Sequence, residues 1–138
     1  MAYDLDRFKK AQAEDYETAL EEIKRGRKDS HWIWYIFPQL KELGHSYNAK
    51  YYGIDGLDEA KAYMADAELR NNLLEITDAL LSQPETDIHR VMGYPDDLKL
   101  RSSMTLFEAA APDQSVFGEV LDKFYGGERD DATLNLLA

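Results

Sequence analysis

The sequence predicts a mainly α fold, in which about six or seven short helices pack around one core with at most one or two short strands. Three observations support this prediction. Apolar residues recur at helical spacing in several segments, the 138 residues suit one domain, and no linker rich in proline, glycine or serine divides them. We therefore expect residues 1–138 to form a single compact domain.

The N-terminal part of the chain predicts two helices. In residues 4–12, Leu5 and Phe8 lie on one face, and Asp4 is a suitable N-cap. Residues 15–25 have a clearer apolar stripe, followed by a glycine that suits a C-cap. The stripe has the i, i+3, i+4, i+7 spacing of an amphipathic helix: Tyr16, Ala19, Leu20 and Ile23.

Residues 32–37 are an unbroken run of large apolar residues that ends at Pro38. The β propensity of these residues favours a strand, whereas the lack of a second convincing strand to pair with favours a helical turn. Periodicity does not choose between the two. We expect residues 39–56 to be irregular, because glycines recur there at turn positions.

The second half of the chain predicts most of the helices. One begins at Asp58 and is followed closely by another over residues 66–82, where six leucine and isoleucine residues face inward. A short helix or turn follows at 84–91. Further helices are expected at about 96–110 and 113–125, and a last helical turn is capped by Asp130 or Asp131.

The composition excludes several classes of protein. The chain has 27 acidic and 16 basic residues, so its net charge of −11 repels phosphate backbones and argues against a nucleic-acid-binding protein. It has no apolar run near the ~20 residues of a membrane span, and we expect no membrane association. Without cysteine, it has no disulfide framework or thiolate site. Together with an N-terminus unlike a signal peptide, this favours a cytoplasmic protein.

One segment departs from the acidic composition. Residues 24–51 have six basic and two acidic residues, a net charge of +4, and they include six of the 16 aromatic residues. Basic groups beside aromatic rings suit an anionic ligand with a flat ring, such as a nucleotide. Alternatively, the four bases at positions 24–28 simply favour a helix C-terminus.

The first group of candidate site residues lies in and beside this basic segment. His31 is a candidate general acid or base, and Lys28 is a candidate phosphate ligand. Trp34 is a candidate stacking surface, and Gln39 and Ser46 lie where a polar side chain or loop could contact a ligand. Each has a structural alternative: core packing for the tryptophan, and hydrogen bonds to the backbone for the polar residues.

The second group lies in the helix predicted near 96–110. Lys99, Ser102 and Ser103 share one helical face at i, i+3 and i+4, and Arg101 lies nearby. One cation and two hydroxyls on one face suit a phosphate or a ribose. The alternative is that Lys99 pairs with a carboxylate at the helix start and the serines bond back to the helix backbone.

Neither a metal nor a cofactor is predicted. The three histidines are scattered, and no His-x-x-x-His pair occurs. The acidic residues 128–131 are typical of a solvated turn and helix cap, with magnesium binding only a minor alternative. No Walker loop or Gly-x-Gly-x-x-Gly motif is present.

Several local strings together resemble a bacterial family, that of the domain of unknown function 1810. The two most specific strings are His-Trp-x-Trp-x-x-Phe-Pro-Gln at 31–39 and Lys-Leu-Arg-Ser-Ser-Met-Thr-Leu-Phe at 99–107. Where the family usually has Gly-Leu-Gly, this chain has Glu42-Leu43-Gly44, which leaves the conformation of this loop open. The resemblance spans nearly the whole chain and implies a small, mainly helical domain, but it implies no established activity.

A weaker similarity concerns the order of a Glu-Ala helix, the pair Val91-Met92 and a helix that contains Lys99. In this order the chain resembles the NADAR superfamily, which is linked to NAD and ADP-ribose metabolism.

Two hypotheses follow from the sequence. In the first, residues 27–46 and the helix with Lys99 form a site for a phosphorylated small molecule, with ADP-ribose or an NAD-derived nucleotide as the first candidate, bound or hydrolysed. In the second, the chain is a non-catalytic interaction domain whose acidic helical face meets a basic protein partner of unknown identity.

Overall fold

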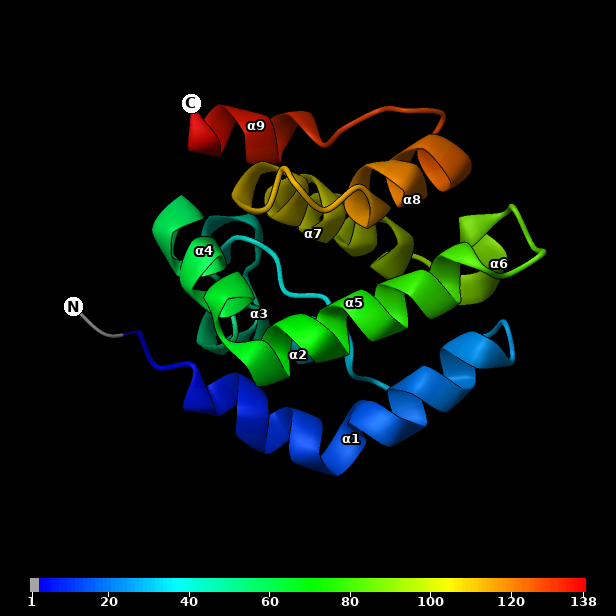
Figure 1. The fold of residues 1–138 in the computed structure, drawn as a ribbon, viewed down its shortest axis with the longest axis horizontal. Coiled ribbons are helices and arrows are strands. Elements are labelled where there is room, and N and C mark those ends of the chain that lie inside the picture. Colours follow the sequence, from blue (N-terminus) through cyan, green and yellow to red (C-terminus); the bar gives the residue numbers. More distant parts are fainter. Residues whose placement is uncertain (1–2) are drawn as a thin grey trace.

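The computed structural model describes residues 3–138, which form nine α-helices and one 3-10 turn (Figure 1). The fold is mainly helical, but it has more helices than the six or seven that the sequence predicted. Within residues 3–138 no strand forms, and a single parallel bridge joins Leu40 to Ile54. The elements are α1 (Asp6–Lys24), α2 (Ile33–Ile36), η1 (Lys41–Leu43), α3 (Tyr47–Tyr51), α4 (Leu57–Ala65), α5 (Ala67–Leu81), α6 (Ile88–Met92), α7 (Asp96–Ala110), α8 (Val116–Tyr125) and α9 (Asp131–Leu137).

Helix α1 corrects the prediction of two separate helices at 4–12 and 15–25. Its buried face runs without a break through Phe8, Gln12, Ala19 and Ile23. A polar residue, Gln12, continues this otherwise apolar face. The Gln12 amide is buried and donates to the Tyr35 carbonyl at 2.8 Å and contacts the Tyr63 hydroxyl at 3.0 Å. No helix breaker lies between the two predicted segments.

The aromatic run at 32–37 forms a helical turn, α2, and not a strand. Trp32, Ile33, Ile36 and Phe37 are all at most 2% exposed, and within the turn only Trp34 is partly exposed. A segment of large apolar residues buried on nearly all sides has no polar face, and its periodicity therefore carries no information about helix or strand.

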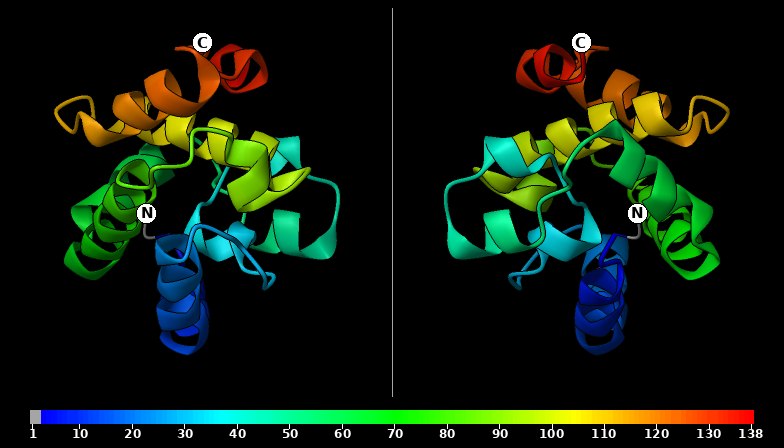
Figure 2. Two further views of the ribbon diagram at one scale, coloured as in Figure 1. Left: turned by 90° about the vertical axis from the view of Figure 1, so that its right-hand side faces the viewer. Right: turned by 90° about the vertical axis from the view of Figure 1, so that its left-hand side faces the viewer.

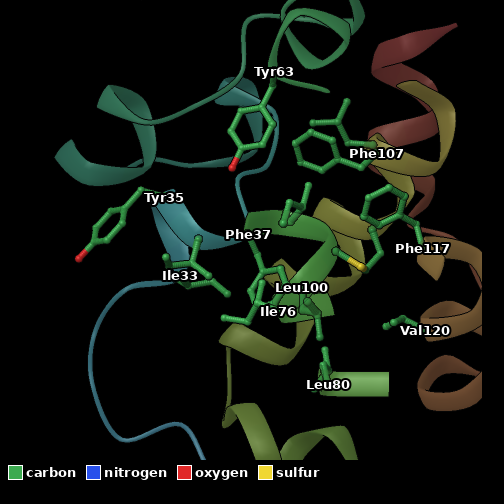
Figure 3. Packing of buried hydrophobic residues seen from close by; sticks show 14 of the residues in the cluster. Ile33, Tyr35, Phe37, Tyr63, Ile76, Leu80, Leu100, Phe107, Phe117 and Val120 are labelled. Carbon is green, nitrogen blue, oxygen red and sulfur yellow. The ribbon is translucent and has the colours of Figure 1, made fainter. Parts of the chain in front are cut away.

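The core is one continuous cluster of apolar side chains. Helices α1 and α5 pack side by side along one side of the molecule, and α7 packs against α4, α8 and α9 on the other (Figure 1). Between them, Phe107 lies 5.1 Å from the Tyr63 ring and 5.9 Å from the Phe117 ring, measured between centroids (Figure 3). No helix in residues 3–138 is both long and apolar enough to cross a bilayer.

Residues 39–54 form a closed loop, which we call the 39–54 loop, at the side of the molecule (Figure 2). Its ends are joined by two backbone hydrogen bonds of 2.9 Å, from Ile54 N to Gln39 O and from Lys41 N to Ile54 O. Two close approaches require glycine. A Cβ on Gly44 would lie 2.2 Å from a side-chain atom of α3, and one on Gly53 would lie 2.4 Å from the Lys41 backbone.

The 39–54 loop contains helix α3, where the sequence predicted irregular structure. The Ser46 hydroxyl caps this helix by accepting the backbone N–H of Ala49 at 3.1 Å. The helix has only five residues, Tyr47–Tyr51, and two of them, Tyr47 and Tyr51, are large exposed aromatics. A helix this short has no apolar stripe that a periodicity search can detect.

Candidate functional site

An open cleft of about 370 Å³ lies between the 39–54 loop, the first turns of α7 and the start of α9. The loop and α7 are far apart in the sequence, and only the packing of the helices brings them together. The polar and charged side chains that line the cleft are Gln39, His45, Ser46, Lys99, Ser102 and Asp130. Four of these, Gln39, Ser46, Lys99 and Ser102, are site residues that the sequence predicted.

Lys99 is the cation of this cleft. Its side chain is 27% exposed, and its Nζ lies 3.7 Å from Asp96 Oδ1. On another side, the Nζ lies 5.5 Å from the centre of the Trp34 ring, which is a cation–π distance. The ion pair with Asp96 is long, so it is weaker than a close pair and leaves the ammonium able to bind an anion from the cleft.

Asp130 forms the wall opposite the loop and is tightly hydrogen-bonded. Its Oδ2 accepts the Ser102 hydroxyl at 3.0 Å, and both the backbone N–H and the hydroxyl of Thr133 at 3.1 Å and 2.5 Å. The other oxygen, Oδ1, lies 4.0 Å from an Arg101 nitrogen. Asp130 therefore caps α9, as the sequence predicted, and also joins α9 to α7.

Trp34 lies beneath the cleft. With Gln39 and Ala49, which also line the cleft, it surrounds a small void of about 10 Å³. The indole Nε1 is buried and has no hydrogen-bond partner among residues 3–138. A buried N–H without a partner costs free energy, so this atom is a donor available to a bound group or a single water.

The remaining predicted residues do not line the cleft. Lys28 is only 5% exposed, and its Nζ pairs with Asp96 Oδ2 at 2.9 Å, so it anchors the start of α7. His31 is exposed just before α2, away from the cleft lining. Arg101 lines an adjoining pocket, which shares Asp130 with the cleft. Ser103 is fully buried, because the next position along α7 is turned by about 100° from Ser102 toward the core.

Two residues at the cleft were not among the predicted site residues. His45 is exposed and lines the cleft where His31 does not. Its position between Gly44 and Ser46, in a loop that the sequence predicted, could have indicated a site residue. The sequence predicted Asp130 or Asp131 as a helix cap, with magnesium binding as a minor alternative, and did not predict the contact of Asp130 with Ser102, which joins residues 28 positions apart. No group of three or more metal-binding side chains occurs in the described residues.

Comparison with known proteins gives the family of the chain. Residues 2–137 match the family described as "Protein of unknown function (DUF1810)". The chain belongs to the DUF1810 family. The conserved hypothetical protein Rv1873 from Mycobacterium tuberculosis, known from a crystal structure, is 45% identical, with a TM-score of 0.96 over 98% of this chain and 96% of that one. No curated protein matches the chain. The DUF1810 fold described above is thus shared by a second, crystallographically characterised chain.

Proposed function

We propose that the cleft between the 39–54 loop and α7 binds a small phosphorylated metabolite. The observation that carries this proposal is the convergence of Lys99 with the hydroxyls of Ser46 and Ser102 and the amide of Gln39 on one open cleft. A lysine ammonium is a compact positive charge that suits phosphate oxygens, and hydroxyl and amide groups suit a sugar or phosphate edge.

The ring of Trp34 supports a nucleotide as the ligand. It lies under the cleft, with a buried donor that lacks a partner in the described chain. An aromatic side chain beside a cation is a suitable surface for a flat, electron-poor ring. ADP-ribose or an NAD-derived nucleotide is our first candidate, and the similarity to the NADAR superfamily favours the same choice.

If the bound molecule is also cleaved, we expect hydrolysis of a glycosidic or phosphate-ester bond. His45 and Asp130 then replace His31 as the groups for proton transfer, because they line the cleft and His31 does not. An imidazole can donate or accept a proton, and a carboxylate can accept one. The hydrogen bonds to one oxygen of Asp130 hold the other oxygen in a constant position.

The experiment is a thermal-shift screen of the pure protein with NAD, ADP-ribose, mononucleotides, sugar phosphates and inorganic phosphate. A ligand at 100 times its Kd stabilises the folded state by about 2.7 kcal/mol, which raises the Tm by several degrees. We expect one ligand class to give this shift, Lys99→Met to abolish it, and Lys10→Met, on the exposed surface of α1, to retain it. A flat response to the whole panel would overturn the proposal.

The alternative is a protein-interaction domain, and one observation favours it. Glu14, Glu17 and Glu21 are all exposed and follow one face of α1, which forms an acidic ridge suited to a basic partner. Under this hypothesis the ligand panel gives no response. Charge reversal at the three glutamates abolishes capture of the basic partner, whereas Lys99→Met leaves this capture unaffected.

A further inference from the structure

A second hollow adjoins the cleft on the outer side of the 39–54 loop. It has a volume of about 400 Å³ and is lined by Lys41, Glu42, Gly44, His45 and Lys50. Gly44 and His45 line both the cleft and this hollow, so the two are adjacent at these residues. A ligand that extends from the cleft past His45 would reach the two lysines.

Neither lysine of the hollow is neutralised by an ion pair. Lys41 and Lys50 are exposed, and within residues 3–138 neither forms an ion pair, like six of the nine lysines. Lys99 of the cleft, by contrast, pairs with Asp96. Glu42 is the single carboxylate among the five residues that line the hollow.

This local positive charge stands out in a protein of net charge −11. A hollow lined mainly by one sign of charge concentrates ligands of the opposite sign. Glu42 is the one carboxylate beside the two lysines and pairs with neither, so an anion that binds there reduces their mutual repulsion. The charge therefore points to an anionic group of the ligand, and not to its ring.

The backbone that holds the lysines is rigid. The Lys41 N–H donates to the Ile54 carbonyl at 2.9 Å, and the Gly53 backbone packs so closely on Lys41 that a Cβ would lie 2.4 Å away. Gly44 packs equally closely on α3, which carries Lys50. The two lysine side chains thus extend from backbone positions that the loop holds in place.

We infer that one ligand spans the cleft and the hollow and has two phosphoryl groups, the first beside Lys99 and the second beside Lys41 and Lys50, with His45 beside the oxygen that bridges them. The inference rests on the proposed function and makes it narrower. It assigns the ligand to the nucleoside diphosphates and their esters, in place of mononucleotides. Lys41 and Lys50 become the residues that distinguish two phosphates from one.

Isothermal titration of the full chain with ADP, AMP and adenosine tests the inference. We expect wild-type protein to bind ADP at least about 10-fold more tightly than AMP, because the second phosphate gains two cations. In the double variant Lys41→Met/Lys50→Met we expect ADP affinity to fall to the AMP value while AMP affinity stays within about twofold. Lys99→Met should weaken both nucleotides, and Lys10→Met neither. Lys10, Lys41 and Lys50 are exposed, and Lys99 is 27% exposed with only a long ion pair, so these variants are expected to retain the fold.

The results separate this inference from the proposed function. Equal affinities for ADP and AMP, both weakened by Lys99→Met, would overturn the second phosphate site and leave the cleft as a mononucleotide site. Equal loss of ADP and AMP affinity in the double variant would overturn it too, since the lysines would then act on the ligand as a whole. Absence of binding by either nucleotide would overturn the proposed nucleotide site and, with it, the inference.

Discussion

Glu22 holds together the connection between α1 and α2, and its replacement makes a sharp test of the structure. Its side chain is buried, with the residue 3% exposed, yet no basic side chain of residues 3–138 forms an ion pair with it. Its oxygens instead accept four hydrogen bonds: from the backbone N–H groups of Asp29 (2.7 Å) and Ser30 (2.9 Å), from the Ser30 hydroxyl (2.6 Å) and from the Trp32 indole N–H (3.0 Å).

These contacts determine the charge state of the carboxylate. Burial by itself raises the pKa of Glu22, but the hydrogen bonds from Ser30, Trp32 and Asp29 outweigh it and lower the pKa from 4.5 to about 2. Each pKa unit corresponds to about 1.4 kcal/mol. The ionised carboxylate therefore contributes about 3 kcal/mol to the free energy of unfolding at neutral pH.

The sign of the pH dependence follows from the direction of this shift. Because the pKa is lower in the folded state, the contribution is complete above pH ~5 and is lost as the pH falls toward ~2. Glu22→Gln removes the charge and one pair of acceptor sites. We expect it to lower the free energy of unfolding by about 2–3 kcal/mol at pH 7, and by progressively less as the pH falls.

Urea unfolding of wild type, Glu22→Gln and the control Glu21→Gln at pH 7, 5 and 3 measures this difference. Glu21 precedes Glu22 on α1 and is exposed, so its variant should stay within about 0.5 kcal/mol of wild type. Other carboxylates titrate equally in all three proteins and cancel from the comparison. A Glu22→Gln penalty below about 0.5 kcal/mol at pH 7, or one that is the same at pH 3, would refute the assignment of the four hydrogen bonds.

Three further substitutions test the core and the 39–54 loop. The Arg7 guanidinium is 9% exposed and lies 2.9 Å from Glu59. Glu59→Gln leaves this cation buried without its counter-charge, so urea unfolding should show a free energy of unfolding lower by about 3 kcal/mol. Gly44→Ala should abolish the ligand-induced thermal shift because its Cβ collides with α3, whereas Gly56→Ala, with open space around it, should retain the shift. Phe107→Ala, fully buried between two aromatic rings, should lower the free energy of unfolding by about 3–5 kcal/mol, and a urea midpoint close to that of wild type would contradict its central place in the core.

Local periodicity explains which helices were predictable. The predicted ranges 66–82 and 96–110 agree closely with α5 (Ala67–Leu81) and α7 (Asp96–Ala110). Helix α7 is buried at every position from 102 to 107, whereas α5 has one buried face opposite an exposed one. Such a face is recorded in residue spacing alone. Prediction was wrong or undecided at two helices without a simple apolar face: a buried glutamine continues the face of α1, and α2 is buried except at Trp34.

The sequence also predicted one part of the candidate site and not the other. The sequence determined that Lys99 and Ser102 share one side of a helix, since i and i+3 positions do so in any α-helix, and that Asp130 or Asp131 caps the last helix, of which the structure shows Asp130. It did not determine what faces them. That His45 and not His31 reaches the cleft, and that Lys28 pairs with Asp96 inside the molecule, depends on how the 39–54 loop closes and packs beside α7. Which residues share a face of a helix depends only on neighbours within one turn. Whether two segments distant in the sequence come into contact depends on the packing of the whole core, and only the tertiary structure decides this.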